Sequence, residues 1–326
     1  MTDSCLLCAG RNLKLLRKYR TKSTEGAVLF GHAAIAECAE CRLIQVVNPP
    51  PAEELQAYYR QDYRKDGYGG ANVADLAKFP YDNLYYYNRG KSICELLRGF
   101  VKHRADRPLH ILDVGAGYGH TLYFMGKQFP DASLHAIEFS DPCVKQLQSQ
   151  HISVSMLPIE QVLCETTITY DVVILSHVLE HLIDPKNILG LIRSRLARNG
   201  ILYVEVPNIP CESILQYPDH VWAPRHDEPH ITFFSENVLG MLMTRSGFEP
   251  QFSSTCGPLY RYISKFRYTL PPFRTTVEGL MPRAFFQFLR RLEVTQGIRV
   301  KEREDSFFQY GGTDRIWIRS IWNPSD

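Results

Sequence analysis

The chain has 326 residues, of which 44% are hydrophobic and 22% charged, a composition that supports a buried core and excludes wholesale disorder. Its formal net charge of +2 gives little long-range attraction for nucleic acid or for an anionic membrane surface. The apolar runs are far shorter than the roughly 20 residues of a membrane-spanning helix, and the first residues, MTDSCLLCAG, lack a secretory pattern. We therefore expect a soluble, cytoplasmic protein with no membrane partner.

Four of the nine cysteines form two CxxC pairs near the start of the chain. Cys5 and Cys8 make the first pair, Cys38 and Cys41 make the second, and 29 residues separate the pairs. Two such pairs supply four thiolates, which complete a tetrahedral shell around one zinc ion and leave no open position. The pattern predicts a structural Zn²⁺ site in a small ribbon of residues 1–48, the alternative being four unrelated buried cysteines.

Residues 49–107 are predicted to form a linker and a helical lid. The NPPP run at 48–51 favours an extended backbone, and AEELQAYY directly after it predicts a helix. A second helix is expected within residues 81–103, because the apolar residues of this segment lie mostly on one helical face.

From residue 108 onward, strand and helix patterns alternate, which is typical of parallel strands joined by crossover helices. Strands are predicted at 109–114, 133–139, 152–156, 170–176 and 200–206, and helices at 119–128, 141–150, 185–198 and 235–248. FEPQFSS and RIWIRSIW are expected to close the sheet, with a helical insertion at about 255–314 between them, because so long a connection is unusual for a plain loop. We therefore predict a doubly wound, Rossmann-like α/β domain over 108–326, built on a seven-stranded, mostly parallel sheet.

The first strand of this domain runs into a glycine-rich turn, LDVGAGYG. Its spacing differs from the dinucleotide fingerprint, since His120 stands where the third glycine would be, and no Gly-Lys-Ser/Thr of a P-loop follows. Glu138 ends the second strand, 19 residues after Gly119, where a carboxylate can accept hydrogen bonds from both hydroxyls of a ribose. A cofactor with a ribose but no pyrophosphate would explain this loop; on its own, Glu138 could equally be a solvated carboxylate.

Four motifs follow one another within residues 109–250: LDVGAGYG, AIEFS, YDVVILSHVLEHLIDP and GILYVEVPN. Together they resemble the class I S-adenosylmethionine-dependent methyltransferases. Residues 38–63 also resemble the zinc-binding module found ahead of many such enzymes, sugar C-methyltransferases among them. The resemblance implies that the glycine loop lines the methionine end of the cofactor, that Glu138 binds its ribose and that residues 158–160 flank its adenine. The cofactor-binding residues implied in this way are Asp113, Gly115, Ala116, Gly117, Gly119, Glu138, Phe139, Ser140, Pro158, Ile159, Ser176 and His177.

The segment HVLEH, residues 177–181, also fits the HxxEH pattern of a zinc peptidase. That chemistry needs both histidines and the glutamate on a regular helix, whereas this segment directly follows an apolar strand and stops at Asp184 and Pro185. The resemblance instead puts the segment beside cofactor and acceptor and makes His181 a candidate catalytic residue. A capping or packing role for His181 stays open.

A histidine-rich segment, HVWAPRHDEPHITFFS at 220–235, follows the fifth predicted strand. Methyl transfer needs alignment of nucleophile and methyl group and usually removal of a proton, for which histidine has a suitable pKa. The resembling sugar C-methyltransferases carry a His-Glu-His cluster just before a Phe-Ser pair. His230 keeps that spacing and is the first candidate for the base, whereas Pro229 displaces the other candidates, Glu228 and His226. This departure leaves C-, O- and N-methylation open.

The sequence thus predicts an S-adenosylmethionine-dependent methyltransferase whose acceptor is a small molecule, such as a sugar or a secondary metabolite. Two other functions stay open: methylation of RNA, which the near-neutral charge disfavours, and a scaffold that binds the cofactor without turnover. The oligomeric state also stays open.

Overall fold

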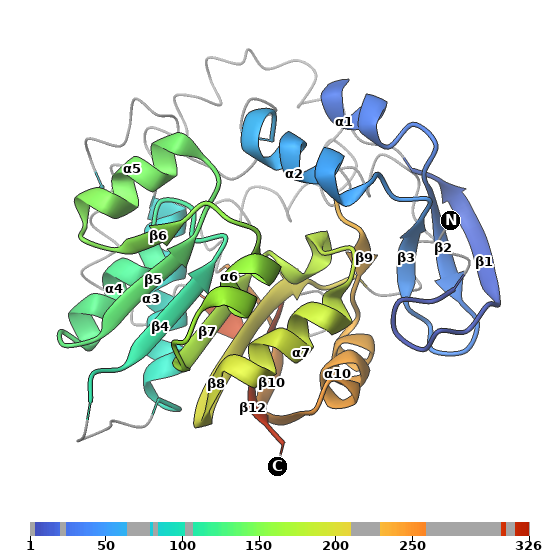
Figure 1. The fold of residues 1–326 in the computed structure, drawn as a ribbon. Helices are drawn as coiled ribbons and strands as arrows, with labels where there is room; N and C mark the ends of the chain where they lie inside the picture. The colour runs from blue at the N-terminus through green and yellow to red at the C-terminus, as the bar shows by residue number, and fades with distance from the viewer. Residues whose placement is uncertain are drawn as a thin grey trace, which may run out of the picture.

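The structure is a computed structural model, shown in Figure 1, which describes residues 4–19, 24–63, 79–80, 84–101, 107–209, 229–258, 308–310 and 317–325. Within these residues the strands form two sheets, a central one of eight strands and an N-terminal one of four. None of the described helices combines the length and the apolar character needed to cross a membrane.

The central sheet confirms the predicted Rossmann-like fold. Its strands, in spatial order, are β11 (Phe308–Tyr310), β10 (Phe248–Pro258), β12 (Trp317–Pro324), β8 (Leu196–Pro207), β7 (Tyr170–Ser176), β4 (His110–Val114), β5 (Ser133–Ile137) and β6 (Ser153–Ser155). Strands β4 to β8 pair in parallel, and β12 lies antiparallel between β8 and β10. Seven strands therefore form the predicted, mostly parallel sheet, to which β11 adds a short edge.

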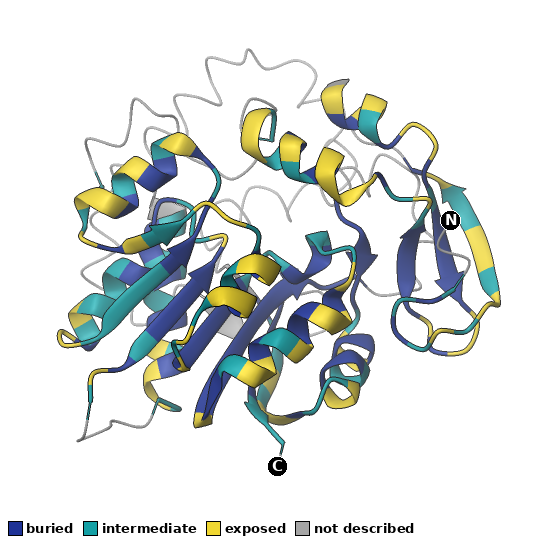
Figure 2. Ribbon diagram, viewed as in Figure 1, coloured by how far each residue is buried: buried dark blue, intermediate teal, exposed yellow. Residues whose placement is uncertain are grey.

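Helices cover both faces of this sheet, which explains why its central strands are continuous apolar runs. All residues of β7 except the last are buried, and Figure 2 shows the central strands in dark blue between helices with exposed outer faces. The sheet has a hydrophobic core on each face, and successive residues of β7 point into one core and then the other. One core contains Val172 and Ile174, the other Val173 and Leu175.

The first core holds the apolar faces of α3 (Leu84–Arg98), α4 (His120–Gln128) and α5 (Asp141–Ser149). The second core holds those of α6 (Ile159–Glu165), α7 (Pro185–Arg195) and α10 (Glu236–Arg245). The segment predicted as a linker and lid thus contributes α3 to a helical layer of the central domain. Of the predicted insertion at 255–314, residues 255–258 end β10 and residues 308–310 form β11, while the rest lies outside the described residues.

Helix ends follow local sequence signals. Ser235 accepts a hydrogen bond from the backbone N–H of Val238 at the start of α10, as predicted for an N-cap. Asp184 does the same for Asn187 in α7, whose first residue is Pro185.

The N-terminal sheet has the order β1 (Leu13–Lys18), β2 (Ala34–Cys38), β3 (Ile44–Val47) and β9 (Thr232–Phe233). Strand β9 comes from the segment after β8, so residues nearly two hundred positions apart pair here, Ile44 with Phe233 and Gln45 with Thr232. Helices α1 (Thr24–Leu29) and α2 (Ala52–Gln61) contribute Leu29 and Leu55 to the hydrophobic core of this sheet. Its small core includes Ile231 and Phe233, so the N-terminal module packs directly against the loop that carries His230.

Candidate active site

The glycine loop joins β4 to α4 at the carboxyl end of the parallel strands, where ligands bind in open α/β sheets. Gly115, Gly117 and Gly119 have φ values of 66°, 57° and 84°, a backbone region that favours glycine. A Cβ atom on Gly115 would lie 2.8 Å from Cγ2 of Val178, and one on Gly119 would lie 2.6 Å from Cδ2 of Leu147. The loop therefore needs glycine both for its conformation and for close contact with the turn after β7.

Glu138 lies beside this loop, just after β5, and is 9% exposed. Its Oε2 accepts a hydrogen bond of 2.8 Å from the backbone N–H of Gly117. Its Oε1 accepts two more, from Phe139 at 3.0 Å and from Ser140 at 2.9 Å. Carboxylate oxygens accept hydrogen bonds from hydroxyl groups as well as from N–H groups, so this side chain is of a kind that binds a ligand hydroxyl. The structure thus brings Glu138 and the loop together, while the contact with ribose stays a prediction.

Asp113, near the end of β4, is 3% exposed. Burial raises the pKa of this carboxyl to about 8, with Arg89 opposing the shift and Glu138 adding to it. The side chain therefore carries a proton over much of the neutral range.

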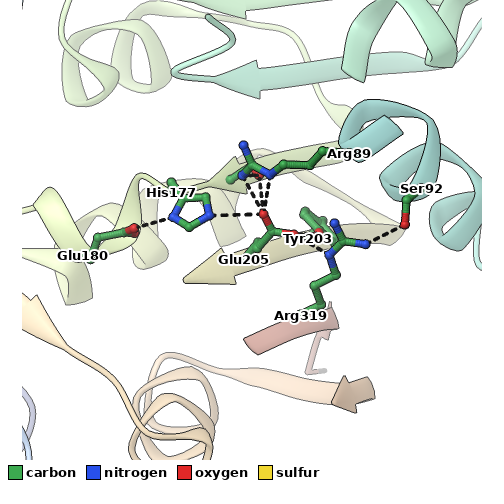
Figure 3. A network of polar contacts seen from close by, with 8 residues as sticks. Arg89, Ser92, His177, Glu180, Tyr203, Glu205 and Arg319 are labelled. Carbon is green, nitrogen blue, oxygen red and sulfur yellow. Dashed lines mark hydrogen bonds and ion pairs between the residues drawn. The ribbon is translucent and has the colours of Figure 1, made fainter. Parts of the chain in front are cut away.

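Figure 3 shows a buried ionic network around Glu205 of β8. Arg89 of α3 approaches its Oε1 within 2.5 Å, while Arg319 of β12 and Tyr203 both donate to its Oε2, the tyrosine at 2.9 Å. Arg319 also donates to Ser92 Oγ at 2.7 Å. Burial alone would raise the pKa of Glu205, but the guanidinium groups of Arg319 and Arg89 hold it well below the usual range.

His177 extends this network to the turn after β7. Its Nε2 lies 3.3 Å from Glu205 Oε1 and its Nδ1 lies 3.1 Å from Glu180 Oε1. Burial and the charge of Arg89 lower the pKa of His177, but its hydrogen bonds with the two carboxylates outweigh them and raise it to about 9. Arg89 also donates to Ser176 Oγ at 2.5 Å. Both Ser176 and His177 were predicted near the cofactor, and both hold the end of β7 in place.

The turn after β7 is not the helix of a zinc peptidase. Only Leu179–His181 form a single 3₁₀ turn, η2, and His177 has a positive φ of 58°. The ring of His177 faces carboxylates, whereas His181 Nδ1 lies 2.9 Å from the hydroxyl of Tyr59. The Nδ1 atoms of the two histidines thus have different hydrogen-bond partners, and His177 is not in the group of side chains that brings His181 together with Glu180 and His230.

His181 and His230, both predicted as catalytic candidates, lie side by side with ring centroids 4.8 Å apart, edge to face. The backbone N–H of Ile231 donates to the carbonyl of Glu180 at 2.7 Å, which ties the two segments together. The two imidazoles thus form one cluster beside a buried carboxylate.

Helix α2 reaches this region from the N-terminal module. In Figure 1, it lies between the N-terminal sheet and α5. Tyr59 contacts the ring of His181, with centroids 5.6 Å apart. Arg60 donates to the carbonyl of Met156 at 3.1 Å and lies 5.4 Å from the centroid of the Phe139 ring. One helix therefore contacts both the histidine cluster and the segments predicted to hold the adenosine part of the cofactor.

The other predicted residues lie in the glycine loop, at the start of α6, or outside the described residues. Ala116 lies within the glycine loop, and Pro158 precedes α6. Ile159 is the first residue of α6 and is buried in the core. His226 and Glu228 lie outside the described residues.

The four predicted zinc ligands lie together, with their sulfur atoms all within 4.8 Å of one another. Cys5 Sγ is 3.4 Å from Cys41 Sγ, and Cys8 Sγ is 3.5 Å from Cys38 Sγ. A tetrahedral zinc ion with bonds of about 2.3 Å needs sulfurs roughly 3.8 Å apart, whereas a disulfide needs about 2.05 Å. The backbone N–H of Leu7 points at Cys5 Sγ from 3.4 Å, which suits a thiolate. The cluster fits a zinc ion and does not fit disulfides.

Several residues of the site were missed from the sequence, and some carried a usable signal. Glu205 and Arg319 are charged residues within apolar strands, and a buried charge requires a partner of opposite sign. Tyr59, Arg60 and Arg89 lie on helices where polar residues are ordinary, so nothing local distinguished them.

Comparison with known proteins gives a match to the methyltransferase domain family over residues 85–251, just over half of the chain. The malonyl-[acyl-carrier protein] O-methyltransferase of Halalkalibacterium halodurans is 29% identical over 131 residues, which cover 37% of this chain and 48% of that protein. The match thus spans about half the length of this curated relative. The matched family segment contains the glycine loop, Glu138 and the turn at 177–181.

Two solved structures are similar at the level of the chain trace. The plantazolicin methyltransferase BpumL, in complex with SAH, gives a TM-score of 0.46 at 15% identity, covering 83% of this chain and 94% of that one. The 1,6-didemethyltoxoflavin-N1-methyltransferase of Burkholderia thailandensis gives 0.48 at 16% identity, covering 90% and 96%.

Proposed function

Because the chain belongs to the methyltransferase domain family, we propose that it is an enzyme that transfers the methyl group of S-adenosylmethionine to a small-molecule acceptor. The observation that carries the proposal is the position of Glu138. Its buried carboxylate accepts a hydrogen bond from the backbone of the glycine loop at the carboxyl edge of the sheet, and carboxylate oxygens are also acceptors for hydroxyl groups. This arrangement suits a ligand that presents hydroxyl groups, as the ribose of S-adenosylmethionine does.

When bound, S-adenosylmethionine supplies a methyl group on a positively charged sulfur. Asp113 and the glycine loop would hold the methionine end, and Glu138 the ribose. Arg89 hydrogen-bonds to Ser176 and Glu205 contacts His177. Held in this way, Ser176 and His177 would line the site between cofactor and acceptor. Alignment of this kind is the larger part of what methyl transfer demands of an enzyme.

His181 and His230 are proposed to face the acceptor. His181 lies on the turn after β7, and His230 lies beside it on the segment after β8. Val178, in the same turn as His181, packs against Gly115 of the glycine loop. Between the two histidines and the cofactor, an acceptor would present its nucleophilic atom to the methyl group that bound S-adenosylmethionine would supply. His230 would orient this nucleophile and take up its proton. Tyr59 and α2 would cover the cluster and exclude water.

We further propose that Cys5, Cys8, Cys38 and Cys41 hold one structural zinc ion, since their sulfurs converge at distances that suit a tetrahedral shell. The ion would fix the two knuckles of the N-terminal sheet.

The proposal is tested by titration calorimetry with S-adenosylmethionine, followed by mass spectrometry of reactions with a panel of acceptors. The panel contains nucleotide-linked sugars, hydroxylated secondary metabolites, an RNA pool and a malonyl thioester, because the relative from H. halodurans is named for that group. We expect micromolar binding and methylation of a small molecule. Absence of binding by folded protein contradicts the proposal, methylation of RNA alone replaces the acceptor class, and binding without any transfer favours the scaffold.

A further inference from the structure

We propose that Glu180, His181 and His230 form a second metal site, which binds one divalent transition-metal ion of the Zn²⁺, Fe²⁺, Co²⁺ or Ni²⁺ type. Each of the three side chains offers a ligand atom, and these atoms lie within 4.8 Å of one another. Ions of this kind hold nitrogen and oxygen ligands at about 2.0–2.2 Å, so ligand atoms on one ion are separated by roughly 3 to 4.4 Å. A small inward movement of the side chains closes the shell.

Burial of the Glu180 carboxylate favours a cation at this site. Glu180 is 1% exposed, and its Oε2 accepts no hydrogen bond from any residue in the described part of the chain. A buried carboxylate oxygen without a partner is costly, because desolvation is not compensated. His230, which is 2% exposed, and His181 lie next to it. A cation between the three side chains would compensate this oxygen.

His181 and Glu180 already have the outer contacts typical of metal ligands. Metal-binding histidines usually donate their second ring N–H to a carbonyl or carboxylate, which fixes the tautomer. His181 Nδ1 lies 3.3 Å from the carbonyl of Pro229 and 2.9 Å from the hydroxyl of Tyr59, so Nδ1 has the outer contacts and Nε2 is the ring nitrogen proposed to bind the ion. The other oxygen of Glu180 bonds to His177 at 3.1 Å, so the carboxylate is oriented as well.

Hydrogen bonds from several segments fix the backbone around the site. Ile231 N–H donates to the carbonyl of Glu180 at 2.7 Å, and its own carbonyl accepts from Val46 N–H at 2.8 Å. Tyr19 donates to the carbonyl of His230 at 3.2 Å. The position of the three ligands therefore does not depend on a mobile surface loop.

The donor set indicates the kind of ion. Two imidazoles and one carboxylate suit zinc, iron, cobalt or nickel better than magnesium or calcium, which prefer oxygen alone. Three protein ligands leave at least one position open, as in catalytic rather than structural sites. On the proposed function, an acceptor's oxygen or nitrogen would take the open position. With the ion bound, His230 is a ligand that positions the acceptor, and it acts as the base only in the chain without the ion. The binding of the ion itself does not depend on methyl transfer.

The test uses the full chain with its cysteine site loaded with zinc, titrated with Co²⁺ by calorimetry. We expect one Co²⁺ per chain in the wild type. Glu180→Gln and His181→Ala should each weaken binding more than about 100-fold, beyond the 10- to 100-fold typical of outer contacts. Tyr59→Phe should fall within that smaller range. His151→Asn changes an exposed histidine whose φ of 60° asparagine tolerates, and it should bind as the wild type does.

A measurement on the wild type keeps the test independent of how the variants fold. Bound Co²⁺ should show weak visible bands without sulfur-to-metal charge transfer, and its proton NMR spectrum should contain two hyperfine-shifted imidazole N–H signals. Absence of Co²⁺ binding, charge transfer from sulfur, or equal affinity in the folded Glu180→Gln variant would each overturn the proposal. Because no methyl acceptor is used, a failure here is distinct from a failure of the methyltransferase proposal.

Discussion

Arg89 of α3 and Glu205 of β8 form a buried ion pair, with Nη2 and Oε1 2.5 Å apart. The same carboxylate bonds to Arg319 and Tyr203 and lies against His177, so four elements of the fold converge on it. Removal of its charge would leave two guanidinium groups without this anion, and that of Arg319 is fully buried.

We therefore expect Glu205→Gln to lower the free energy of unfolding by about 3–5 kcal/mol, the cost typical of breaking a buried pair. Denaturant unfolding followed by circular dichroism measures this. The control is Glu95→Gln on the same helix as Arg89, because Glu95 forms an exposed pair with Lys91 at 3.5 Å. Its loss should stay below about 0.5 kcal/mol. Equal effects of the two substitutions would mean that the network adds nothing to stability.

The sheet and its helices were predictable because their patterns are local. Strand β7 coincides with the predicted segment 170–176, since a strand buried on both faces reads as an unbroken apolar run. Strand β8 begins at Leu196, four residues before the prediction, because LARN has no apolar pattern and pairs through an irregular register next to Tyr170. The alternation of strand and helix then sets the order of the sheet.

The pairing of β9 with β3 could not be predicted. It involves two residues on each strand, far apart in the sequence, and so short a segment has no period of its own. The place of Glu138 in the site followed from its position after a strand, whereas the contact of Tyr59 with His181 depends on how the N-terminal module docks. Long-range packing of this kind leaves no local pattern.

Glu138→Gln should weaken binding of S-adenosylmethionine roughly 10- to 100-fold, because charge-assisted hydrogen bonds to the ribose contribute about 1.5–3 kcal/mol. Titration calorimetry should show the same factor for methylthioadenosine, which keeps the ribose but lacks the amino-acid end. If the affinity fell for S-adenosylmethionine but not for methylthioadenosine, Glu138 would support the glycine loop and would not bind the ribose. Glu165→Gln, at an exposed position on α6, is the control and should bind as the wild type does.

Asp113→Asn should change how stability depends on pH. The pKa of Asp113 is about 8 in the folded chain, above its ordinary value of 3.8, because burial disfavours the charge. As pH rises from about 4 to 8, the unfolded chain loses this proton first, and the free energy of unfolding of the wild type falls by up to about 1.4 kcal/mol per pH unit. Asparagine cannot ionise, so the variant lacks this decline.

The difference in unfolding free energy between Asp113→Asn and the wild type should therefore grow in favour of the variant across that window and level off above pH 8. Asp131→Asn, at an exposed position, should show no such trend. A difference that is flat with pH for Asp113→Asn would mean that this carboxyl is ionised in the folded chain at neutral pH.

His230→Ala should reduce turnover about 10²- to 10⁴-fold once an acceptor is known, as expected for loss of a general base, and leave cofactor affinity nearly unchanged. The residue lies beside His181, on the segment after β8. His226→Ala should be milder, because Pro229 displaces that residue from the spacing His230 keeps. If His230→Ala kept full turnover and His226→Ala lost it, the base would be His226, on the N-terminal side of Pro229.

The N-terminal module should affect the acceptor side of the site more than the cofactor side. Strand β3 pairs with β9, and Tyr19 holds the carbonyl of His230, whereas the glycine loop hydrogen-bonds to β5 through Gly115 and Ile137. Loss of zinc should therefore disturb His230 through these two contacts, because metal binding in such small modules supplies much of their folding free energy.

We expect Cys41→Ser to lose zinc by elemental analysis and to lose most turnover, while S-adenosylmethionine affinity falls by less than about 3-fold, or roughly 0.6 kcal/mol. Cys164→Ser removes an exposed cysteine outside the cluster and should keep zinc, turnover and cofactor affinity. If Cys41→Ser lost zinc but kept turnover, the pairing of β3 with β9 would not position His230. If cofactor affinity collapsed together with turnover, the two halves of the site would unfold as one unit, and the coupling would not be specific to the acceptor side.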